Sequence, residues 1–113
     1  MTKYLISFPA EAMVLTDEQF IQAGIDARDV MRQAKAAGVW VFGGGILEEV
    51  EPVRVSADGV ITPGHYDPTH RLNGGFTVLE LPDRETAVEW AAKFAWGCKC
   101  DQELREFGYD PES

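Results

Sequence analysis

Both histidines of the chain lie in one short segment, "GHYDPTHRLNGGF", residues 64 to 76. His65 stands two residues before Asp67, and His70 follows three residues after that aspartate. An imidazole titrates near neutral pH, and a neighbouring carboxylate can orient it, so this spacing suits a general acid or base. We therefore predict that His65 transfers a proton, with Asp67 as its partner.

The same segment allows two other interpretations. His65, Asp67 and His70 offer two imidazoles and a carboxylate, which would be three metal ligands if the loop folded back on itself. A metal site also needs outer partners that hold its ligands, so we expect neither a metal nor another cofactor. Alternatively, Asp67 and Pro68 form a turn, and the histidines are exposed polar residues.

Side chains that could hold a ligand lie both in this segment and in an apolar run before it. Tyr66 lies between the two residues of the predicted pair and His70 follows them, and we expect both to contribute to binding. Trp40 and Phe42 belong to "VWVF", and one or both could line a pocket for a hydrophobic small molecule. The glycines at 43–45 predict a backbone bend rather than a phosphate loop, because no helix follows them directly.

The two cysteines, Cys98 and Cys100, fall in the segment "CKCDQELREF", residues 98 to 107. Its alternation predicts a strand, placed at an edge because residues 101–106 are highly charged. Two cysteines at this spacing on a strand point to the same face and rarely reach disulfide geometry. We expect two reduced thiols.

The elements that must position these residues follow from hydrophobic periodicity, helix caps and turn signals. Thr16 and Gln19 predict a capping box, Gly38 a helix end, and Asp83 a second N-cap. Asp58-Gly59 predicts a two-residue hairpin turn. In chain order we expect a strand (3–8), a helix (17–38), a central strand (39–45), a hairpin (51–62), a strand (74–81), a helix (84–97) and a strand (98–107).

Two strand-helix-strand units in succession indicate an α+β fold of the ferredoxin-like, split βαβ type. Such a fold has a four-stranded antiparallel sheet with both helices on one face, and the hairpin would be an addition to it. The 113 residues suffice for a single domain, residues 1–113. The uncovered face of the sheet would be apolar, so we expect a homodimer that joins sheet to sheet.

Charge and hydropathy limit the partners of the protein. The formal net charge is −9, with 19 acidic and 10 basic residues, and this charge repels nucleic-acid phosphates and anionic lipid surfaces. The sequence contains no apolar run of transmembrane length, and the apolar stretch near residue 1 is too short for a signal peptide. We therefore expect a cytoplasmic protein that contacts neither nucleic acid nor membrane.

Several stretches resemble the DGPF or YCII-related proteins of the dimeric α+β barrel class. They are "KYLISF", "AAGVWVFGGGILEEVEPVRVSADGVI" and "GGFTVLELPDRETAVEWAAKF", and they are spread from residue 3 to residue 94. The stretch "TPGHY", residues 62–66, stands where that family carries Thr-Asp-Gly-Pro-Phe, and it contains His65. The YCII branch is proposed to use a histidine of its first helix, but Arg28 and Asp29 stand there in this chain.

The resemblance implies a dimeric α+β barrel but no particular substrate, because proteins of this fold have many functions. One hypothesis is a small-molecule enzyme of lyase, isomerase or hydrolase type that uses His65 as an acid or base in an apolar cleft. The alternative is a non-catalytic dimeric module that binds a ligand or takes part in transcription-associated interactions.

Overall fold

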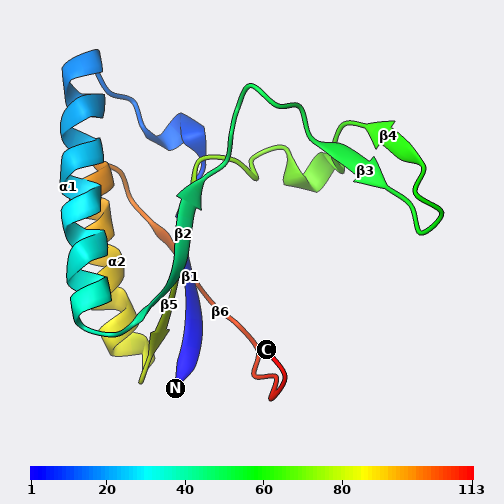
Figure 1. Ribbon diagram of the computed structural model, residues 1–113. Helices are drawn as coiled ribbons and strands as arrows, with labels where there is room; N and C mark the ends of the chain where they lie inside the picture. Colours follow the sequence, from blue (N-terminus) through cyan, green and yellow to red (C-terminus); the bar gives the residue numbers. More distant parts are fainter.

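The polypeptide folds into one helical layer packed against one face of a sheet, with a small hairpin that projects to the other side (Figure 1). A computed structural model describes all residues 1–113. Two 3₁₀ turns, Ala10–Ala12 and Asp67–Thr69, interrupt the loops. The main elements are β1 (Thr2–Phe8), α1 (Asp17–Ala36), β2 (Trp40–Gly45), β3 (Val53–Val55), β4 (Ile61–Pro63), β5 (Gly75–Leu81), α2 (Arg84–Cys98) and β6 (Glu103–Glu106).

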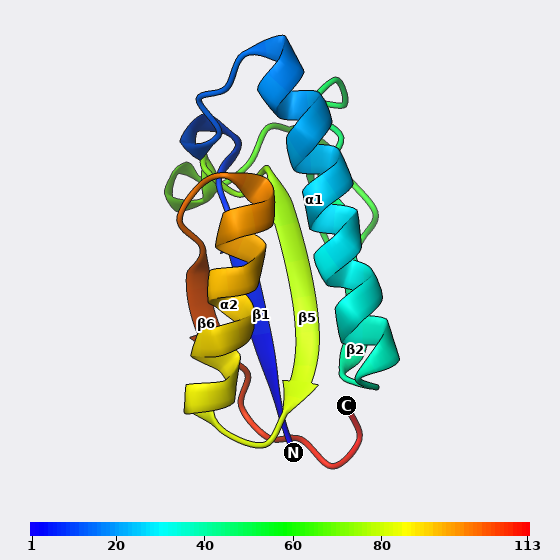
Figure 2. The same ribbon diagram turned by 90° about the vertical axis from the view of Figure 1, so that its left-hand side faces the viewer.

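The main sheet has the strand order β2-β5-β1-β6, and every neighbouring pair is antiparallel. Tyr4 of β1 lies opposite Leu79 of β5, and Ile6 lies opposite Leu104 of β6. Both helices lie in front of the strands when the molecule is viewed from the helical side (Figure 2). The predicted α+β fold with two helices, a four-stranded antiparallel sheet and an additional hairpin is confirmed.

The predicted helix ends of α1 are confirmed. The Thr16 hydroxyl accepts a hydrogen bond from the Gln19 amide at 3.3 Å, and the Gln19 side chain accepts one from the Thr16 amide at 2.9 Å. Gly38 has φ +75°, the left-handed conformation that ends a helix without steric cost. Neither α1 nor α2 combines the length and the apolar character needed to cross a membrane.

The core lies between the two central strands and the helices. Its members come from β1, β5, α1 and α2, and each is at most a few per cent exposed. They are Tyr4, Ile6, Val30, Ala34, Leu79, Leu81, Ala87 and Phe94. In α1 the members of this cluster, Val30 and Ala34, belong to the C-terminal half of the helix, and Ala23 is buried in the N-terminal half outside the cluster.

The predicted central position of β2 is wrong, because this strand is an edge of the sheet and pairs only with β5. A bulge between Trp40 and Phe42 shifts the register of the pair. Trp40 lies opposite Leu79 on the core side, whereas Phe42 lies opposite Val78 on the other face and is 64% exposed. Strand β2 is therefore apolar on both faces although only the face toward the helices is covered, and its other face is an exposed apolar surface.

The predicted strand over residues 98–107 is also wrong at its beginning. Helix α2 continues to Cys98, and Lys99 ends it in the left-handed conformation with φ +61°. Cys100 lies in the loop that leads to β6, so the cysteines do not share a strand face. The strand β6 itself lies at a sheet edge, as expected. The predicted N-cap of α2 is also confirmed, because the Asp83 side chain accepts a hydrogen bond from the Thr86 amide at 2.8 Å.

Gly97 serves helix packing and not the predicted helix end. It is buried inside α2, and a Cβ at this position would lie 3.0 Å from the Cα of Ala27 and 3.1 Å from its amide nitrogen. Real Cβ atoms rarely come so close to backbone. Glycine therefore allows α2 to approach the backbone of α1 directly.

The hairpin of β3 and β4 forms an arm with no buried residue from 46 to 63. The hairpin is confirmed, but its turn is longer than the predicted two residues: Gly59, with φ +82°, donates a hydrogen bond to the Ser56 carbonyl at 2.9 Å, and Ala57 and Asp58 lie between them. The arm points away from the helical layer (Figure 1). None of its valines or isoleucines belongs to the core cluster or to the residues packed against it.

Two glycine-to-alanine variants test the contact between the helices. Alanine has the higher helix propensity by about 1 kcal/mol, so Gly24→Ala, where a Cβ meets no atom within 4 Å, should raise the free energy of unfolding by up to that amount. Gly97→Ala should lower it by about 1 kcal/mol, because overpacking against the Ala27 backbone exceeds the propensity gain. Urea denaturation followed by circular dichroism measures both, and equal stabilisation by the two changes would contradict the close helix contact.

Candidate functional site

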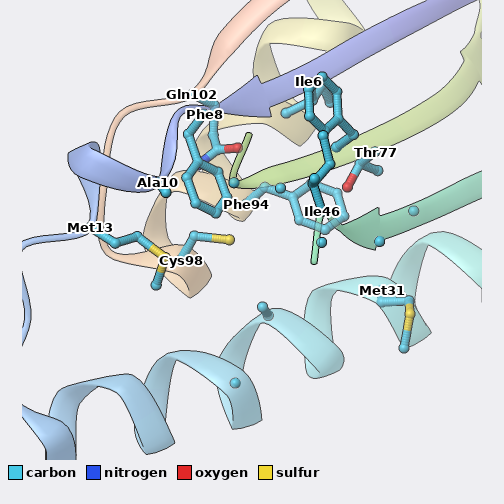
Figure 3. Close-up of a pocket in the computed structure, with 18 of the residues that line it drawn as sticks. Ile6, Phe8, Ala10, Met13, Met31, Ile46, Thr77, Phe94, Cys98 and Gln102 are labelled. Atoms are coloured by element: carbon cyan, nitrogen blue, oxygen red, sulfur yellow. The ribbon is translucent and has the colours of Figure 1, made fainter. Parts of the chain in front are cut away.

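A large apolar cleft of about 950 Å³ lies between α1 and the sheet. Figure 3 shows apolar and sulfur-containing side chains of β1, α1, the loop after β2 and α2 around it, among them Ile6, Phe8, Met31, Ile46 and Phe94. The apolar lining is made by Ile6, Phe8, Met13, Phe20, Met31, Trp40, Ile46, Phe76 and Phe94, with two alanines. The volume and lining are those of a small-molecule site.

The cleft exists because small residues stand on both of its walls. On α1 the lining residues recur at helical spacing, and Gly24 and Ala27 occupy the middle of that stripe. On the sheet, five glycines at 43–45 and 74–75 line the opposite wall. A Cβ on Gly43 would come within 2.5 Å of the Trp40 ring, and one on Gly75 within 2.7 Å of the Phe8 ring. Glycine thus leaves room for the aromatic rings that face the cleft.

Few polar groups reach the cleft. Thr77 and Gln102 contribute a hydroxyl and an amide, and the Gln102 amide already donates to the Cys100 carbonyl at 3.2 Å. Glu11 is paired with Arg71 at 3.1 Å. The remaining charged side chains of the lining are Arg28 on α1 and Glu48 on the loop after β2.

The Cys98 thiol lines the cleft, and its sulfur is visible beside Met13 in Figure 3. Burial raises the pKa of this thiol from its ordinary 9.0 to about 11, and neighbouring Cys100 adds to the effect. Burial also raises the pKa of Cys100. Both cysteines are free, and because the thiolate is the nucleophile, neither is activated at neutral pH.

The predicted pair of His65 and Asp67 lies on the other side of the sheet. The 3₁₀ turn Asp67–Thr69 is found with the arm, away from the helices (Figure 1). Nδ1 of His65 lies 2.6 Å from the Tyr66 carbonyl oxygen, and Nδ1 of His70 lies 3.0 Å from the Asp67 carbonyl oxygen. Both rings are exposed and bond to the backbone of their own loop, not to the Asp67 carboxylate.

The catalytic role of this segment therefore stays a prediction. Neither His65 nor Asp67 lines the cleft, and Tyr66 and His70, expected as binding residues, do not line it either. Instead, the Arg54 guanidinium lies 5.6 Å from the centroid of the exposed Tyr66 ring. No group of three or more histidine, cysteine, aspartate or glutamate side chains is arranged to hold a metal ion.

The two predicted aromatic binding residues are separated by the sheet. Trp40 lines the cleft, and the Lys35 ammonium lies 5.7 Å from its ring centroid. Phe42 lies on the opposite face, in a shallow apolar depression with Ile46, Leu72 and Phe76. Only Trp40 is therefore placed to contact a ligand in the cleft.

Comparison of the sequence with models of known protein families and with curated proteins gives no match. The resemblance to the DGPF and YCII-related proteins stays a prediction. A function must accordingly be argued from the geometry of the cleft.

Sequence reasoning did not assign Arg28, Thr77 or Gln102 to a site. The signal for Arg28 was present, since it follows Ala27 in the stripe that continues to Met31 at helical spacing. Thr77 and Gln102 lie far apart in the sequence, and no local pattern brings them to one cavity.

Alkylation by iodoacetamide tests the state of the Cys98 thiol. In a Cys100→Ser variant at pH 8, the native protein should react at least about tenfold more slowly than the same protein unfolded in urea, because burial, the main cause of the raised pKa, remains in the variant and leaves little thiolate. The native rate should still be rising at pH 10, since the thiolate forms only near pH 11. A native rate that levels off near pH 9 would contradict the raised pKa.

Proposed function

We propose that the protein binds a small apolar molecule in the cleft between α1 and the sheet. The observation that carries this proposal is an open cleft of about 950 Å³ whose lining is mostly apolar and whose walls are kept clear by glycine and alanine. Ligand sites in proteins typically have this size and composition, with a few polar groups that orient the ligand.

Binding without catalysis is better supported than a lyase, isomerase or hydrolase reaction. General acid–base chemistry needs a titratable group within hydrogen-bond reach of the substrate. In the cleft, the Cys98 thiol is neutral at pH 7, and Glu11 is held by Arg71. Glu48, the other carboxylate of the lining, is exposed on the loop after β2. His65 lies outside the lining. The ligand-binding alternative is therefore the function that we infer.

We further propose that the chain has the ferredoxin-like topology and forms a homodimer through the face of the sheet opposite the helices, as in a dimeric α+β barrel. The strand order and the placement of both helices on one face support the topology. The apolar side chains Leu5, Phe42 and Val78 on the open face support the interface, because Leu5 and Phe42 both lie opposite Val78 in the pairing.

A cleft-filling variant tests ligand binding. The neutral dye N-phenyl-1-naphthylamine should bind the protein with increased fluorescence, and Gly24→Leu should reduce its affinity at least tenfold by filling the cleft. A Cβ at residue 24 meets no atom within 4 Å, and leucine favours helices, so this variant should remain folded.

The matched control is Ala92→Leu, an exposed position of α2 outside the cleft, which should bind the dye as the unmodified protein does. If the unmodified protein fails to bind the dye, or Gly24→Leu binds it unchanged, the proposed site is wrong.

Sedimentation analysis at micromolar concentration tests the dimer. The unmodified protein should sediment with twice the single-chain mass, and Phe42→Glu should shift it to one chain by placing a charge in the apolar interface. Val88→Glu makes the same change at an exposed position of the helical layer and should leave the mass unchanged. A single-chain mass for the unmodified protein would contradict the dimer.

A further inference from the structure

We infer that the ligand of the cleft carries a carboxylate, which pairs with the Arg28 guanidinium. This inference rests on the proposed function and names the chemical class that the same site would select. It depends on the position of one cation at an apolar cavity and on the absence of a partner for that cation within the chain.

Most basic side chains of the protein are already engaged. Lys3 pairs with Glu80, Lys99 with Asp26, Arg71 with Glu11 and Arg105 with Glu103. Three more lie over aromatic rings, namely Lys35, Arg54 and Lys93. Only Arg28, Arg32 and Arg84 have no ion pair, hydrogen bond or aromatic partner, and of these Arg28 alone lines the cleft.

The surroundings of Arg28 favour an anion that arrives with the ligand. The residue belongs to the stripe of α1 that runs from Gly24 to Met31 and lines the cleft, and it is exposed, so an incoming ligand can reach it. A guanidinium binds a carboxylate through two parallel hydrogen bonds, which are stronger when water is partly excluded. An apolar molecule that carries a carboxylate would fill the cavity and pair with the Arg28 guanidinium.

The other charged groups at the cleft do not supply this partner. Glu11 is paired with Arg71 at 3.1 Å, and Glu48 is exposed on the loop after β2 and forms no ion pair with Arg28. The net charge of −9 repels anions from the protein as a whole. Any preference for a carboxylate must therefore come from the Arg28 guanidinium. Replacing Arg28 by an uncharged residue tests this.

Matched competitors of N-phenyl-1-naphthylamine separate charge from shape. At pH 7, three competitors are titrated separately against the bound dye: 1-naphthaleneacetic acid, its uncharged amide and 1-naphthylmethylamine. We expect the acid to bind roughly three- to tenfold more tightly than the amide, the amine to bind more weakly than the acid, and Arg28→Met to abolish the advantage of the acid.

The control is Arg32→Met, which removes an equally unpaired arginine one turn further along α1 and should keep most of the preference for the acid. Arg28→Lys, which retains the charge but not the planar donor pair, should give an intermediate preference.

The outcomes distinguish this inference from the proposal on which it rests. If the dye does not bind, the proposed function fails and the inference with it. If the dye binds but the acid has no advantage over the amide, if the amine binds best, or if Arg32→Met loses as much as Arg28→Met, the cleft binds apolar molecules and the inference is overturned.

Discussion

The close contact between Gly97 of α2 and the backbone of Ala27 determines where α1 lies, and the site depends on it. Without a side chain at residue 97, α2 approaches the backbone of α1 closely, and of the α1 residues only Val30 and Ala34, in its C-terminal half, belong to the core cluster. The N-terminal half can then stand away from the strands. The cleft is the space that this arrangement leaves, and the residues on both of its walls are small enough to keep it open.

An open cleft has a cost in stability. The fully buried core is confined to a few residues of β1, β5 and the helices, and the half-buried aromatic rings of Phe8 and Trp40 line the open cleft. Such rings lose the dispersion contacts that a filled interior would give them. A ligand that fills the cleft would restore those contacts, and because it binds only the folded chain, it would stabilise the fold in proportion to its concentration.

Local patterns predicted what local interactions determine. The capping box of Thr16, the Asp83 cap and the hairpin turn at Gly59 each depend on hydrogen bonds between residues a few positions apart, and the structure contains all three, although the turn is longer than the predicted two residues. The edge position of β2 and the continuation of α2 to Cys98 depend on which segments meet in space, and no short pattern reports this. The same reason explains the site: His65 was prominent by residue type, whereas Arg28 becomes noticeable only when its helix is placed beside the cavity.

The central position of β1 also has a consequence for how the chain folds. This strand is paired on one side with β5 and on the other with β6, which ends at Glu106, so the first residues of the sheet obtain their last partner only from the far end of the sequence. Contacts between such distant segments slow folding because a long loop must close before they form. On the ribosome, the edge of β1 that pairs with β6 would stay unpaired until residue 106 had emerged. During that interval the apolar β1 is the segment most exposed to wrong pairing, and a chaperone that covers extended apolar strands would act there first.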